Sequence, residues 1–548
     1  MAFRLDLSRR ALLALFLAFA VAWFGTLDYR KLIKADEGRY AEIAREMAVS
    51  GDWLTPRLNG IKYFEKPPLQ YWATAAAFRV FGEREWTARL WPATTGFLCV
   101  LLVFWTGRRL FGDDAGLAAA AVAASSLLFP AMGHFNALDM GLAFFLQLSL
   151  SGFLLAQRAY TPAGARRCML LTWAALGLAV LSKGLVAPVL AGSTLIAYSL
   201  LTRDATPWRR LHLIPGTAVF LLVAAPWFIA VSLANPEFPR FFFYHEHFER
   251  FLTKVHGRAQ PAWYFLPVLA AGALPWTLLM LHAAATAWRR TVAAPFQPRR
   301  FLLVWAVTVF LFFSASGSKL PSYILPMLPA LALLAGEMLP RLGRRALLAH
   351  LAIALVPPLV LLAVPARLAA VVREDIPGEM LAGYAIWLGA AATLWLFGTL
   401  AAAWLAWRRR PGGAVLTLAA AAFLAGQGVL LGHEQLGRSN SAHYIAGQVA
   451  PMMTAGVPFY SVRMYEQTLP FYLRRTVTLV EYRDEMGFGL DQEPGKDIAT
   501  VEAFVRRWRS DQDAFAVMHR NTYQQLVDGG LPMRIVAEDP RRIIVRKP

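Results

Sequence analysis

One of the most polar stretches before residue 430 runs from Ala35 to Trp72 and reads ADEGRYAEIAREMAVSGDWLTPRLNGIKYFEKPPLQYW. It combines the side chains that bind and activate charged substrates, which are Asp36, Glu37, Glu65, Arg39, Lys62, Lys66, Tyr40, Tyr63 and Tyr71. A carboxylate can orient or deprotonate an acceptor group, and an ammonium beside a helix start can hold a phosphate. The stretch therefore predicts a site for an anionic substrate.

Asp36 and Asp139 are the two candidate catalytic acids. Asp36 opens a run with helical spacing, so an N-cap is a second interpretation of it. Asp139 stands at the start of an apolar run, close to His134 and Asn136. A carboxylate at the edge of a membrane span is costly unless it is paired or faces a wet cavity. This cost favours a functional role for Asp139, with an N-cap as the alternative.

Three lysines stand where a substrate phosphate could be bound. Lys66 directly precedes Pro67–Pro68, and proline suits the first turn of a helix. Lys183 and Lys319 lie in Ser-Lys-Gly and Gly-Ser-Lys at the ends of apolar runs, and Tyr323 follows shortly after. We expect anionic partners for them, such as phosphate, pyrophosphate or lipid. Simple anchoring at the membrane surface is the alternative for each lysine.

The segment 233–262 mixes cations and histidines with aromatic residues. Arg250 and Arg258 are candidate substrate contacts. His245 and His247 form a His-x-His pattern that could bind zinc, together with Glu65. Such a short pattern is a weak signal by itself.

The composition is that of a membrane protein. Of the 548 residues, 57% are hydrophobic and only 16% are charged, and the mean hydropathy is +0.44; soluble domains have about 25% charged residues. The net charge of +20 does not indicate a nucleic-acid partner, because most arginines lie in short links between apolar runs, where they orient membrane helices. Cys99 and Cys168 lie at or in apolar segments, so no disulfide framework follows.

Apolar runs near the length of a span, which is about 20 residues, predict thirteen membrane helices. They lie near 10–27, 87–107, 114–132, 138–157, 168–182, 185–201, 212–232, 263–287, 301–316, 322–340, 346–366, 383–406 and 414–432. A further run at 68–82 is short and contains Gln70 and Arg79. If this run lies on the membrane instead of crossing it, the arginine-rich links all face the cytoplasm. The candidate residues then gather on the outer face.

Two regions follow from this topology. Residues 1–432 form the membrane region, with a first outer loop at 28–86 whose helices at 36–49 and after Pro67–Pro68 lie along the membrane surface. Residues 433–548 have the composition of a soluble domain. Short β-like runs alternate there with helical ones, which predicts a small α/β domain. The predicted strands are Phe459–Val462, Val477–Glu481, Phe515–Met518, Arg534–Ala537 and Ile543–Val545, and the predicted helices are Ala442–Met453, Thr500–Arg509 and Thr522–Val527.

Six segments between residues 35 and 329 resemble a known superfamily. They are ADEGRYAEIAREM, YFEKPPLQYW, FGEREWTARLWPA, RRLFG, GLAVLSKGLVAP and SKLPSYILPMLP. The chain is similar through them to the dolichyl-phosphate-mannose protein mannosyltransferases, which have the GT-C fold. Within that superfamily it most resembles the bacterial 4-amino-4-deoxy-L-arabinose (aminoarabinose) transferases of lipid A.

The resemblance implies an inverting glycosyltransferase of the bacterial inner membrane that acts on the periplasmic face. It implies undecaprenyl phosphate–aminoarabinose as the donor, a lipid A phosphate as the acceptor, and polymyxin resistance as the outcome. Asp36 and Asp139 would be the essential acids, and Lys66, Arg39 and Tyr63 would contact the carrier phosphate. The candidate substrate contacts also include Tyr40, Lys183, Lys319, Tyr323, Arg250 and Arg258. No cofactor is expected for catalysis, and a structural zinc near Glu65, His245 and His247 is compatible with the family.

Two other functions stay open at this point. A protein O-glycosyltransferase of the same fold would need one aspartate to act as a base on a hydroxyl group. A lipid transporter would be expected to carry charges at mid-span and broken helices. The polar residues of this sequence cluster outside the apolar runs, which argues against the transporter.

Overall fold

The computed structural model describes residues 8–249, 260–289, 295–368, 371, 373, 375–454 and 456–548, with the backbone alone for Arg9 and residues 247–249. Among these residues, nine helical segments are long and apolar enough to cross a membrane. They are α4 (Glu85–Phe111), α7 (Asp139–Arg158), α8 (Pro162–Lys183), α11 (Leu213–Ala234), α15 (Pro298–Ala315), Pro321–Arg341, Arg344–Leu368, α19 (Gly378–Trp407) and Pro411–Asn440. The chain is therefore a polytopic membrane protein, as the composition predicts.

Several of these spans are built from consecutive shorter elements. Pro321–Arg341 comprises η3 (Pro321–Met327), α16 (Leu328–Met338) and η4 (Leu339–Arg341). Arg344–Leu368 comprises α17 (Arg344–Ile353) and α18 (Val356–Leu368). Pro411–Asn440 comprises α20 (Pro411–Gly432), η5 (His433–Leu436) and α21 (Gly437–Asn440).

Four of the predicted spans take other forms. The helices α1 (Arg9–Phe24) and α9 (Val186–Thr202) are apolar but shorter than the rest. The run at 114–132 is divided into α5 (Asp113–Ser125) and α6 (Leu128–Gly133). The run at 263–287 is a bent pair, with η2 (Ala262–Tyr264) and α13 (Phe265–Gly272) turned by 113° from α14 (Thr277–Thr286). Each of the thirteen predicted ranges thus coincides with helical structure in the described part of the chain, although length and composition alone support nine or ten spans.

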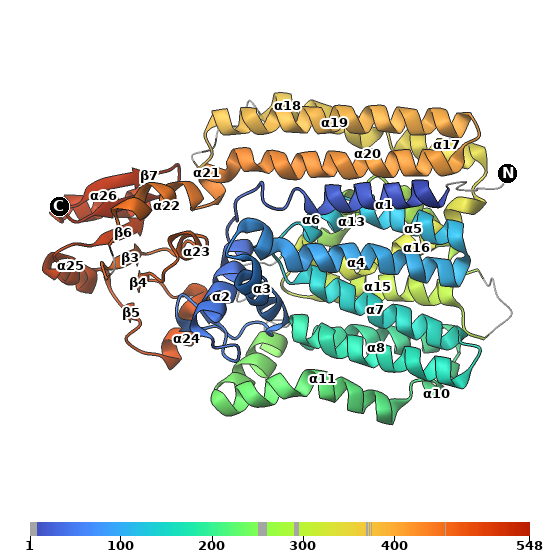
Figure 1. Cartoon of the computed structure of the whole chain (residues 1–548), viewed down its shortest axis with the longest axis horizontal. Helices are drawn as coiled ribbons and strands as arrows, with labels where there is room; N and C mark the ends of the chain where they lie inside the picture. Colours follow the sequence, from blue (N-terminus) through green and yellow to red (C-terminus); the bar gives the residue numbers. More distant parts are fainter. Residues whose placement is uncertain are drawn as a thin grey trace.

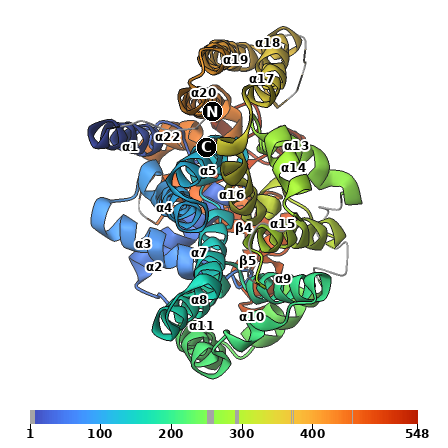
Figure 2. The same cartoon turned by 90° about the vertical axis from the view of Figure 1, so that its right-hand side faces the viewer.

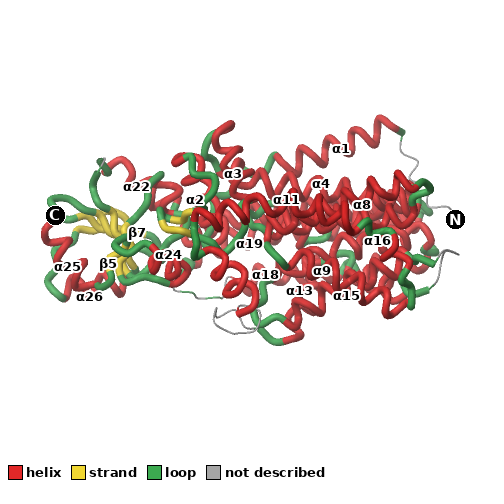
Figure 3. The backbone as a smooth tube through the Cα atoms, turned by 90° about the horizontal axis from the view of Figure 1, so that it is seen from below, coloured by secondary structure: helices red, strands yellow, loops and turns green. Residues whose placement is uncertain are grey.

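The helices run side by side, and the β-strands lie at the end of the bundle opposite the N-terminus (Figures 1 and 3). The helix α3 (Leu69–Phe81) lies at the strand end, where it packs against α2 (Asp36–Ser50) and α4. Its 13 residues give a length of about 20 Å, which is short of the ~30 Å hydrocarbon core. This supports the prediction that residues 68–82 do not cross the membrane.

The tail domain follows η5 and contains a six-stranded sheet in the order β5-β4-β3-β6-β8-β7. The first four strands in that order are parallel. The strand β8 pairs antiparallel with β6, and β7 pairs antiparallel with β8. The strands are β3 (Phe459–Val462), β4 (Thr478–Val480), β5 (Asp497–Ile498), β6 (Phe515–Met518), β7 (Arg534–Glu538) and β8 (Ile543–Arg546). The helices are α22 (His443–Val449), η6 (Ala450–Met452), α23 (Leu469–Leu473), η7 (Asp484–Met486), α24 (Gly487–Gln492), α25 (Val501–Ser510) and α26 (Arg520–Asp528). All five predicted strands and all three predicted helices are present within a few residues.

The helix α2 is more deeply buried than its residue spacing alone indicates. The helix exists, and Tyr40, Ile43, Ala44 and Met47 are buried as its spacing predicts. Its polar residues are buried as well, among them Glu37, Glu42 and Arg45. The helix is therefore enclosed by protein on its polar side as well as on its apolar side, and its position along the membrane surface stays a prediction. The physical reason is that α2 is packed against α3, against the hairpin of β1 (Arg57–Leu58) and β2 (Ile61–Lys62), and against α23 of the tail domain.

Candidate functional site

The start of α2 holds an ion-pair chain that includes the first candidate acid. Arg39 donates from Nη1 to Asp36 Oδ1 at 2.8 Å and from Nη2 to Glu485 Oε2 at 2.5 Å. The Asp36 side chain is 32% exposed, whereas that of Arg39 is 6% exposed. Asp36 makes no N-cap hydrogen bond, because the cap residue is Ala35. A buried guanidinium therefore fixes a carboxylate that can still reach a substrate.

Three buried tyrosines lie beside this chain. Tyr40 and Tyr71 have ring centroids 5.9 Å apart, and Tyr63 belongs to the same hydrophobic cluster. The hydroxyls of Tyr63 and Tyr71 have no hydrogen-bond partner among the described residues. Burial raises the pKa of all three phenols well above 10, and the carboxylates of Glu65 and Asp36 add to the effect. The phenols are therefore neutral at physiological pH and can donate hydrogen bonds.

Lys66 lies between two acidic residues. Its ammonium donates to Glu246 Oε2 at 2.8 Å and to the backbone carbonyl of Glu65 at 2.7 Å. Glu246 belongs to the π-helix η1 (Arg240–Glu249) and lies 180 residues further along the chain. Without a substrate, the charge of Lys66, which we predicted to bind phosphate, is balanced by the carboxylate of Glu246. An incoming phosphate would have to compete with Glu246.

Glu37, the neighbour of Asp36, is a structural anchor. Arg89 binds it with two contacts, Nε to Oε1 at 2.7 Å and Nη2 to Oε2 at 2.8 Å, and both side chains are buried. The backbone N–H of Asn136 donates to Glu37 Oε1 at 3.0 Å. Burial opposes ionisation of this carboxyl, but Arg89, Arg30 and the Asn136 N–H outweigh it and lower the pKa of Glu37 to about 2. Glu37 therefore stays ionised and ties α2 to α4.

Asn136 connects the start of α2 with the loop that carries the second candidate acid. Its side chain accepts a hydrogen bond from Gln70 Nε2 at 2.8 Å, and Gln70 lies in the first turn of α3, next to Tyr71. Three residues after Asn136, Asp139 begins α7 and forms an ion pair with Lys183. The cap residue of α7 is Leu138, so Asp139 is not an N-cap. The Lys183 ammonium also lies 4.4 Å from the centre of the Tyr323 ring.

The structure thus brings Asp139, Lys183 and Tyr323 together. The anionic partner of Lys183 in this structure is the carboxylate of Asp139. Lys319 is buried and donates to the backbone carbonyl of Ser316 at 2.5 Å. It belongs to the same connection, between α15 and η3, that leads to Tyr323.

The predicted zinc ligands and loop arginines are placed only in part. Arg250 and Arg258 lie outside the described residues, as does the side chain of His247. The His245 ring stacks on Phe241, with centroids 5.3 Å apart. Within the described ranges, no group of three His, Cys, Asp or Glu side chains is arranged to hold a metal ion. A zinc bound by Glu65, His245 and His247 therefore stays a prediction.

Three further residues, which the sequence analysis did not single out, lie around the candidate residues. Glu485 accepts a hydrogen bond from Arg39, which also binds Asp36. Gln467 donates to Glu485 Oε1 at 3.0 Å. Both come from the tail domain. Arg89 lies in the segment FGEREWTARLWPA, but no local pattern indicates its pairing with Glu37. The polar cluster, defined here as Asp36, Arg39, Tyr40, Tyr63, Glu65, Lys66, Tyr71, Glu246 and Glu485, is therefore closed by the tail domain.

The polar cluster can hold both an anion and a cation. Lys66 and Arg39 can neutralise a phosphate, and the carboxylates around them can receive an ammonium group. The neutral phenols can donate hydrogen bonds to either. Such a mixed site at the end of a membrane bundle suits a lipid-linked substrate with a charged headgroup.

Two family models match the chain. Residues 445–547 match the aminoarabinose transferase C-terminal domain, and residues 8–242 match the dolichyl-phosphate-mannose-protein mannosyltransferases. An undecaprenyl phosphate-alpha-4-amino-4-deoxy-L-arabinose arabinosyl transferase of Pseudomonas aeruginosa is 38% identical over 341 residues, which are 61% of this chain and 60% of the relative. The relative of the same name from Edwardsiella ictaluri is 33% identical and covered over 58% of its length. These alignments thus reach less than two thirds of the curated relatives.

Solved structures extend the likeness to the whole chain. The crystal structure of ArnT from Cupriavidus metallidurans bound to undecaprenyl phosphate has a TM-score of 0.94 and 40% identity, with 98% of each chain covered. The archaeal oligosaccharyltransferase AglB from Archaeoglobus fulgidus has a TM-score of 0.51 at 14% identity, over 92% of this chain and 69% of AglB. At 14% identity, the likeness to AglB shows a similar fold only.

Proposed function

Because the chain belongs to the ArnT family of undecaprenyl phosphate–aminoarabinose arabinosyl transferases, we propose that it moves 4-amino-4-deoxy-L-arabinose from undecaprenyl phosphate to a phosphate of lipid A. The observation that carries the proposal is the likeness over 98% of both chains to an ArnT that binds undecaprenyl phosphate. The polar cluster supports it, since this donor combines a phosphate with an amino sugar. No metal or other cofactor takes part in the proposed chemistry.

The proposed reaction is a single displacement at the anomeric carbon. An oxygen of the lipid A phosphate attacks that carbon from the side opposite the carrier. The bond between the carbon and the carrier oxygen breaks, and undecaprenyl phosphate leaves with the electron pair. Lys66 and Arg39 stabilise the charge that develops on the leaving phosphate. Glu246 must release Lys66 as the carrier phosphate binds.

Asp36 and Asp139 have the task of orienting the reactants. A lipid A phosphate is already ionised, so no strong base is needed to activate it. Asp36 is held by Arg39 and Asp139 by Lys183, so both carboxylates are fixed in direction. They bind the ammonium group of the sugar and align the acceptor. An active Asp36→Asn protein with an unchanged pH profile of kcat would support this role, and a profile that loses one ionisation would favour a base.

The proposed location is the inner membrane of a bacterium with lipopolysaccharide, with the polar cluster on the periplasmic side. This orientation places the arginine-rich links in the cytoplasm. Lipid A that carries the amino sugar has less negative charge, so cells would resist polymyxin and related cationic peptides.

Expression in a polymyxin-sensitive strain without its own aminoarabinose transferase tests the proposal. Mass spectrometry of lipid A should show aminoarabinose with the unaltered protein, and none with Lys66→Ala at equal protein level. Unmodified lipid A together with newly glycosylated periplasmic proteins would contradict the proposal, and would favour a protein glycosyltransferase.

A further inference from the structure

A pocket lined by tryptophans lies where the first outer loop meets the end of α11. Its volume is about 460 Å³, which is within the range of small-ligand sites. None of its described lining residues belongs to the polar cluster. We call it the tryptophan pocket, and its walls are formed by Gly51, Asp52, Trp53, Leu54, Trp72, Trp227 and Ala230.

The tryptophan pocket lies at the edge of the helix bundle. The helix α11 runs beside α8 at this edge (Figure 2), and it is the least buried of the nine described spans, with only 17% of its apolar stretch buried. Ala230 lies about 6 Å from the end of α11 at Ala234. The next residue, Asn235, donates to Thr55 of the outer loop at 3.0 Å. The pocket is therefore beside lipid at the depth of the headgroups, where tryptophans are common.

The indole N–H groups of two tryptophans are already used inside the protein. Trp72 donates to the backbone carbonyl of Trp53 at 2.7 Å, and Trp227 donates to that of Leu54 at 3.1 Å. An indole has only one N–H. These rings therefore offer the pocket π surface, which attracts cations, and no donor for an anion.

Asp52 supplies a carboxylate to the same pocket. Its Oδ1 accepts hydrogen bonds from the backbone N–H groups of Leu54 and Thr55, both at 3.0 Å. Its Oδ2 forms no hydrogen bond with any residue that the structure describes. A carboxylate oxygen beside ring surfaces suits an ammonium group, which can donate to the oxygen while it contacts the rings.

Arg79 places a positive charge at the rim of the tryptophan pocket. Its guanidinium lies 5.5 Å from the centre of the Trp53 ring and donates to the carbonyl of Ala48 at 3.1 Å. A Cβ atom at Gly51 would lie 3.9 Å from its Nη2. The Arg79 side chain is exposed, so it can also bind an anion. The pocket thus presents a carboxylate within and a guanidinium at its edge, which is the charge pattern that fits a zwitterion.

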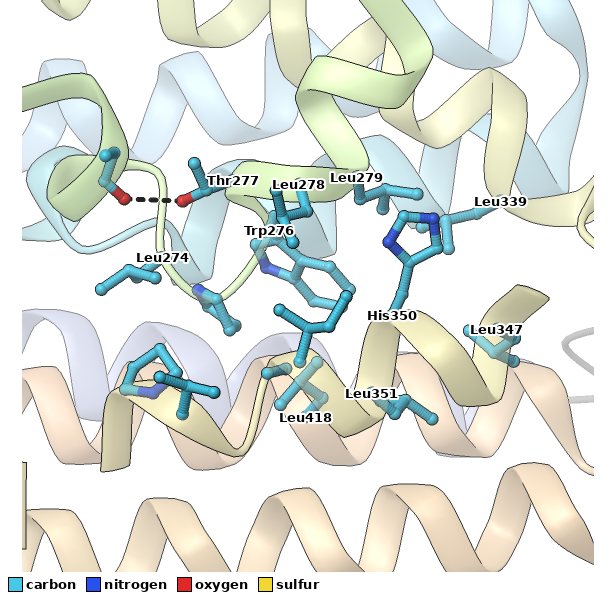
Figure 4. Close-up of a pocket in the computed structure, with 16 residues that line it drawn as sticks. Leu274, Trp276, Thr277, Leu278, Leu279, Leu339, Leu347, His350, Leu351 and Leu418 are labelled. Atoms are coloured by element: carbon cyan, nitrogen blue, oxygen red, sulfur yellow. Dashed lines mark hydrogen bonds between the residues drawn. The ribbon is translucent and has the colours of Figure 1, made fainter. Parts of the chain in front are cut away.

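The pocket in Figure 4 has a different character. It lies between the bent pair α13–α14 and α17, and it is lined mainly by apolar residues such as Trp276, Leu279 and Leu351. The Thr277 hydroxyl there donates to the carbonyl of Ala270 at 2.7 Å. Its described lining residues include no Asp, Glu, Lys or Arg. It therefore offers no charge that would select a headgroup, in contrast to the tryptophan pocket.

We propose that the tryptophan pocket binds the headgroup of a phospholipid that carries a primary ammonium, such as phosphatidylethanolamine. The ammonium lies against the rings of Trp72 and Trp227 and donates to Asp52 Oδ2, and the phosphate lies at Arg79. The inference goes beyond the proposed function and stands independently of it, because binding of this lipid needs no sugar transfer. Since residues 51–55 lead from α2 into β1, a bound headgroup also stabilises this part of the first outer loop.

The substitution Asp52→Asn tests the ammonium contact, because an amide oxygen can still accept from Leu54 and Thr55 but carries no charge. Native mass spectrometry of the purified full-length protein would measure the affinities for phosphatidylethanolamine and phosphatidylglycerol with identical acyl chains. We expect the unaltered protein to bind phosphatidylethanolamine about fivefold more tightly, and Asp52→Asn to bind both lipids equally. The control is Asp28→Asn, at an exposed carboxylate that also accepts a backbone N–H, that of Trp86 at 3.2 Å. Equal affinities of the unaltered protein for the two lipids would reduce the tryptophans to membrane anchors and overturn the proposal.

Two substitutions of Trp72 isolate the contribution of the ring. Trp72→Phe and Trp72→Leu both lose the hydrogen bond to Trp53, but only the phenylalanine keeps a π surface. We expect Trp72→Leu to bind phosphatidylethanolamine about threefold more weakly than Trp72→Phe does, with no difference between them for phosphatidylglycerol. Equal binding of phosphatidylethanolamine by the two variants would remove the ring from the site.

The substitution Arg79→Gln tests the phosphate contact. Both lipids carry the same phosphate, so we expect Arg79→Gln to weaken the binding of both by about the same factor, whereas Asp52→Asn affects phosphatidylethanolamine alone. A loss confined to phosphatidylethanolamine in Arg79→Gln would contradict the proposed orientation of the headgroup.

A lipid-linked amino sugar carries the same two charges, so a third lipid separates the two sources. Undecaprenyl phosphate–aminoarabinose should bind Asp52→Asn as tightly as it binds the unaltered protein, because the proposed function places it in the polar cluster. Weaker binding of this lipid to Asp52→Asn, with the affinity for phosphatidylethanolamine unchanged, would assign the tryptophan pocket to the sugar donor and overturn the proposal.

Discussion

In the proposed reaction, the pairing of Lys66 with Glu246 makes binding of the carrier phosphate an exchange of one anion for another. Both side chains are largely buried, with 14% and 2% exposed, so their interaction is only weakly screened. A phosphate that replaces the Glu246 carboxylate gains the attraction of Lys66 but must first break this ion pair. If Lys66 binds the carrier phosphate as proposed, the affinity for the carrier depends on Glu246 as well as on Lys66.

We predict that Glu246→Gln binds undecaprenyl phosphate about fivefold more tightly, because the amide competes less strongly for the ammonium. Lys66→Ala should weaken the same binding. Isothermal titration in detergent measures both. The control is Glu237→Gln, which removes a comparable ion pair of Lys62 at 2.6 Å. Weaker binding by Glu246→Gln would show that Glu246 assists the phosphate instead of competing with it.

The buried pair of Glu37 and Arg89 should determine part of the response of stability to acid. The pKa of Glu37 is lowered from 4.5 to about 2 by folding. Its stabilising contribution is therefore fully present above about pH 4.5 and is lost as the pH falls toward 2. Glu37→Gln leaves Arg89 buried without its anion and should cost about 3–5 kcal/mol of unfolding free energy at pH 7.

Thermal unfolding of the purified protein between pH 3 and 7 measures this effect. The gap in Tm between the unaltered protein and Glu37→Gln should be largest at pH 7 and should narrow below pH 4.5. A gap that stays constant over this range would mean that the Glu37 carboxylate is not the titrating group.

At the scale of elements, the tail domain docks on the first outer loop through close backbone contacts. Asn59, in the turn between β1 and β2, exchanges two hydrogen bonds of 2.7 Å with the backbone of Val477. A side chain at Gly489 of α24 would overlap the backbone carbonyl of Lys62 in β2. Arg57 binds Glu493 at 2.9 Å across the same contact. The tail domain is therefore closely packed against the first outer loop, which carries most of the polar cluster.

We predict that Gly489→Ala loosens this contact and lowers stability by about 1–3 kcal/mol, because the added methyl group forces the backbones apart. Limited proteolysis should then release the tail domain faster. Gly447→Ala is the control, since a methyl group at Gly447 in α22 meets no atom within 4 Å; it should leave stability unchanged or slightly improved. Equal proteolysis of the two variants would contradict the docking argument.

Local patterns were enough to predict most elements. Apolar runs located the spans, and short alternating runs located β3, β4, β6, β7 and β8. The two-residue β5 and the short α23 and α24 were missed, because so few residues carry no readable pattern. The pattern of α2 was read correctly as a helix, but its burial depends on the tail domain, which lies some 430 residues further along the chain.

The sequence was enough to predict which residue types form the candidate site. It did not show which of these side chains form ion pairs with distant residues. Asp36, Lys66 and Asp139 stand out as polar groups at the ends of apolar runs. Asp36 pairs with Arg39 one helical turn away, but the other pairs join distant parts of the chain. Asp139 and Lys183 are 44 residues apart in sequence, Lys66 and Glu246 are 180 apart, and Arg39 and Glu485 are 446 apart. The three distant pairs arise from tertiary packing, so no local spacing indicates them.

At the scale of the whole molecule, the fold is the GT-C fold that the resemblance implied, with a C-terminal α/β domain at one end of the bundle (Figure 1). The arginine-rich links and the N-terminus lie at the other end. The two ends thus differ in charge and in chemistry. This difference in charge supports the proposed orientation, in which the arginine-rich end faces the cytoplasm.

Single cysteines test this orientation. In a chain with Cys99 and Cys168 changed to alanine, Gln512→Cys in the tail domain should react with a membrane-impermeant maleimide on cells whose outer membrane alone is permeabilised. Thr161→Cys, at the exposed start of α8 in an arginine-rich link, should react only after the inner membrane is opened. Labelling of both positions from the same side would contradict the proposed topology.

The most direct measurement uses the purified protein in lipid vesicles with undecaprenyl phosphate–aminoarabinose and lipid A, followed by mass spectrometry of lipid A over time. The unaltered protein should attach aminoarabinose to lipid A and release undecaprenyl phosphate in equal amount. Asp36→Asn and Lys66→Ala should each slow the transfer by about a hundredfold or more. Transfer at the unaltered rate in both variants would contradict the assignment of the chemistry to the polar cluster.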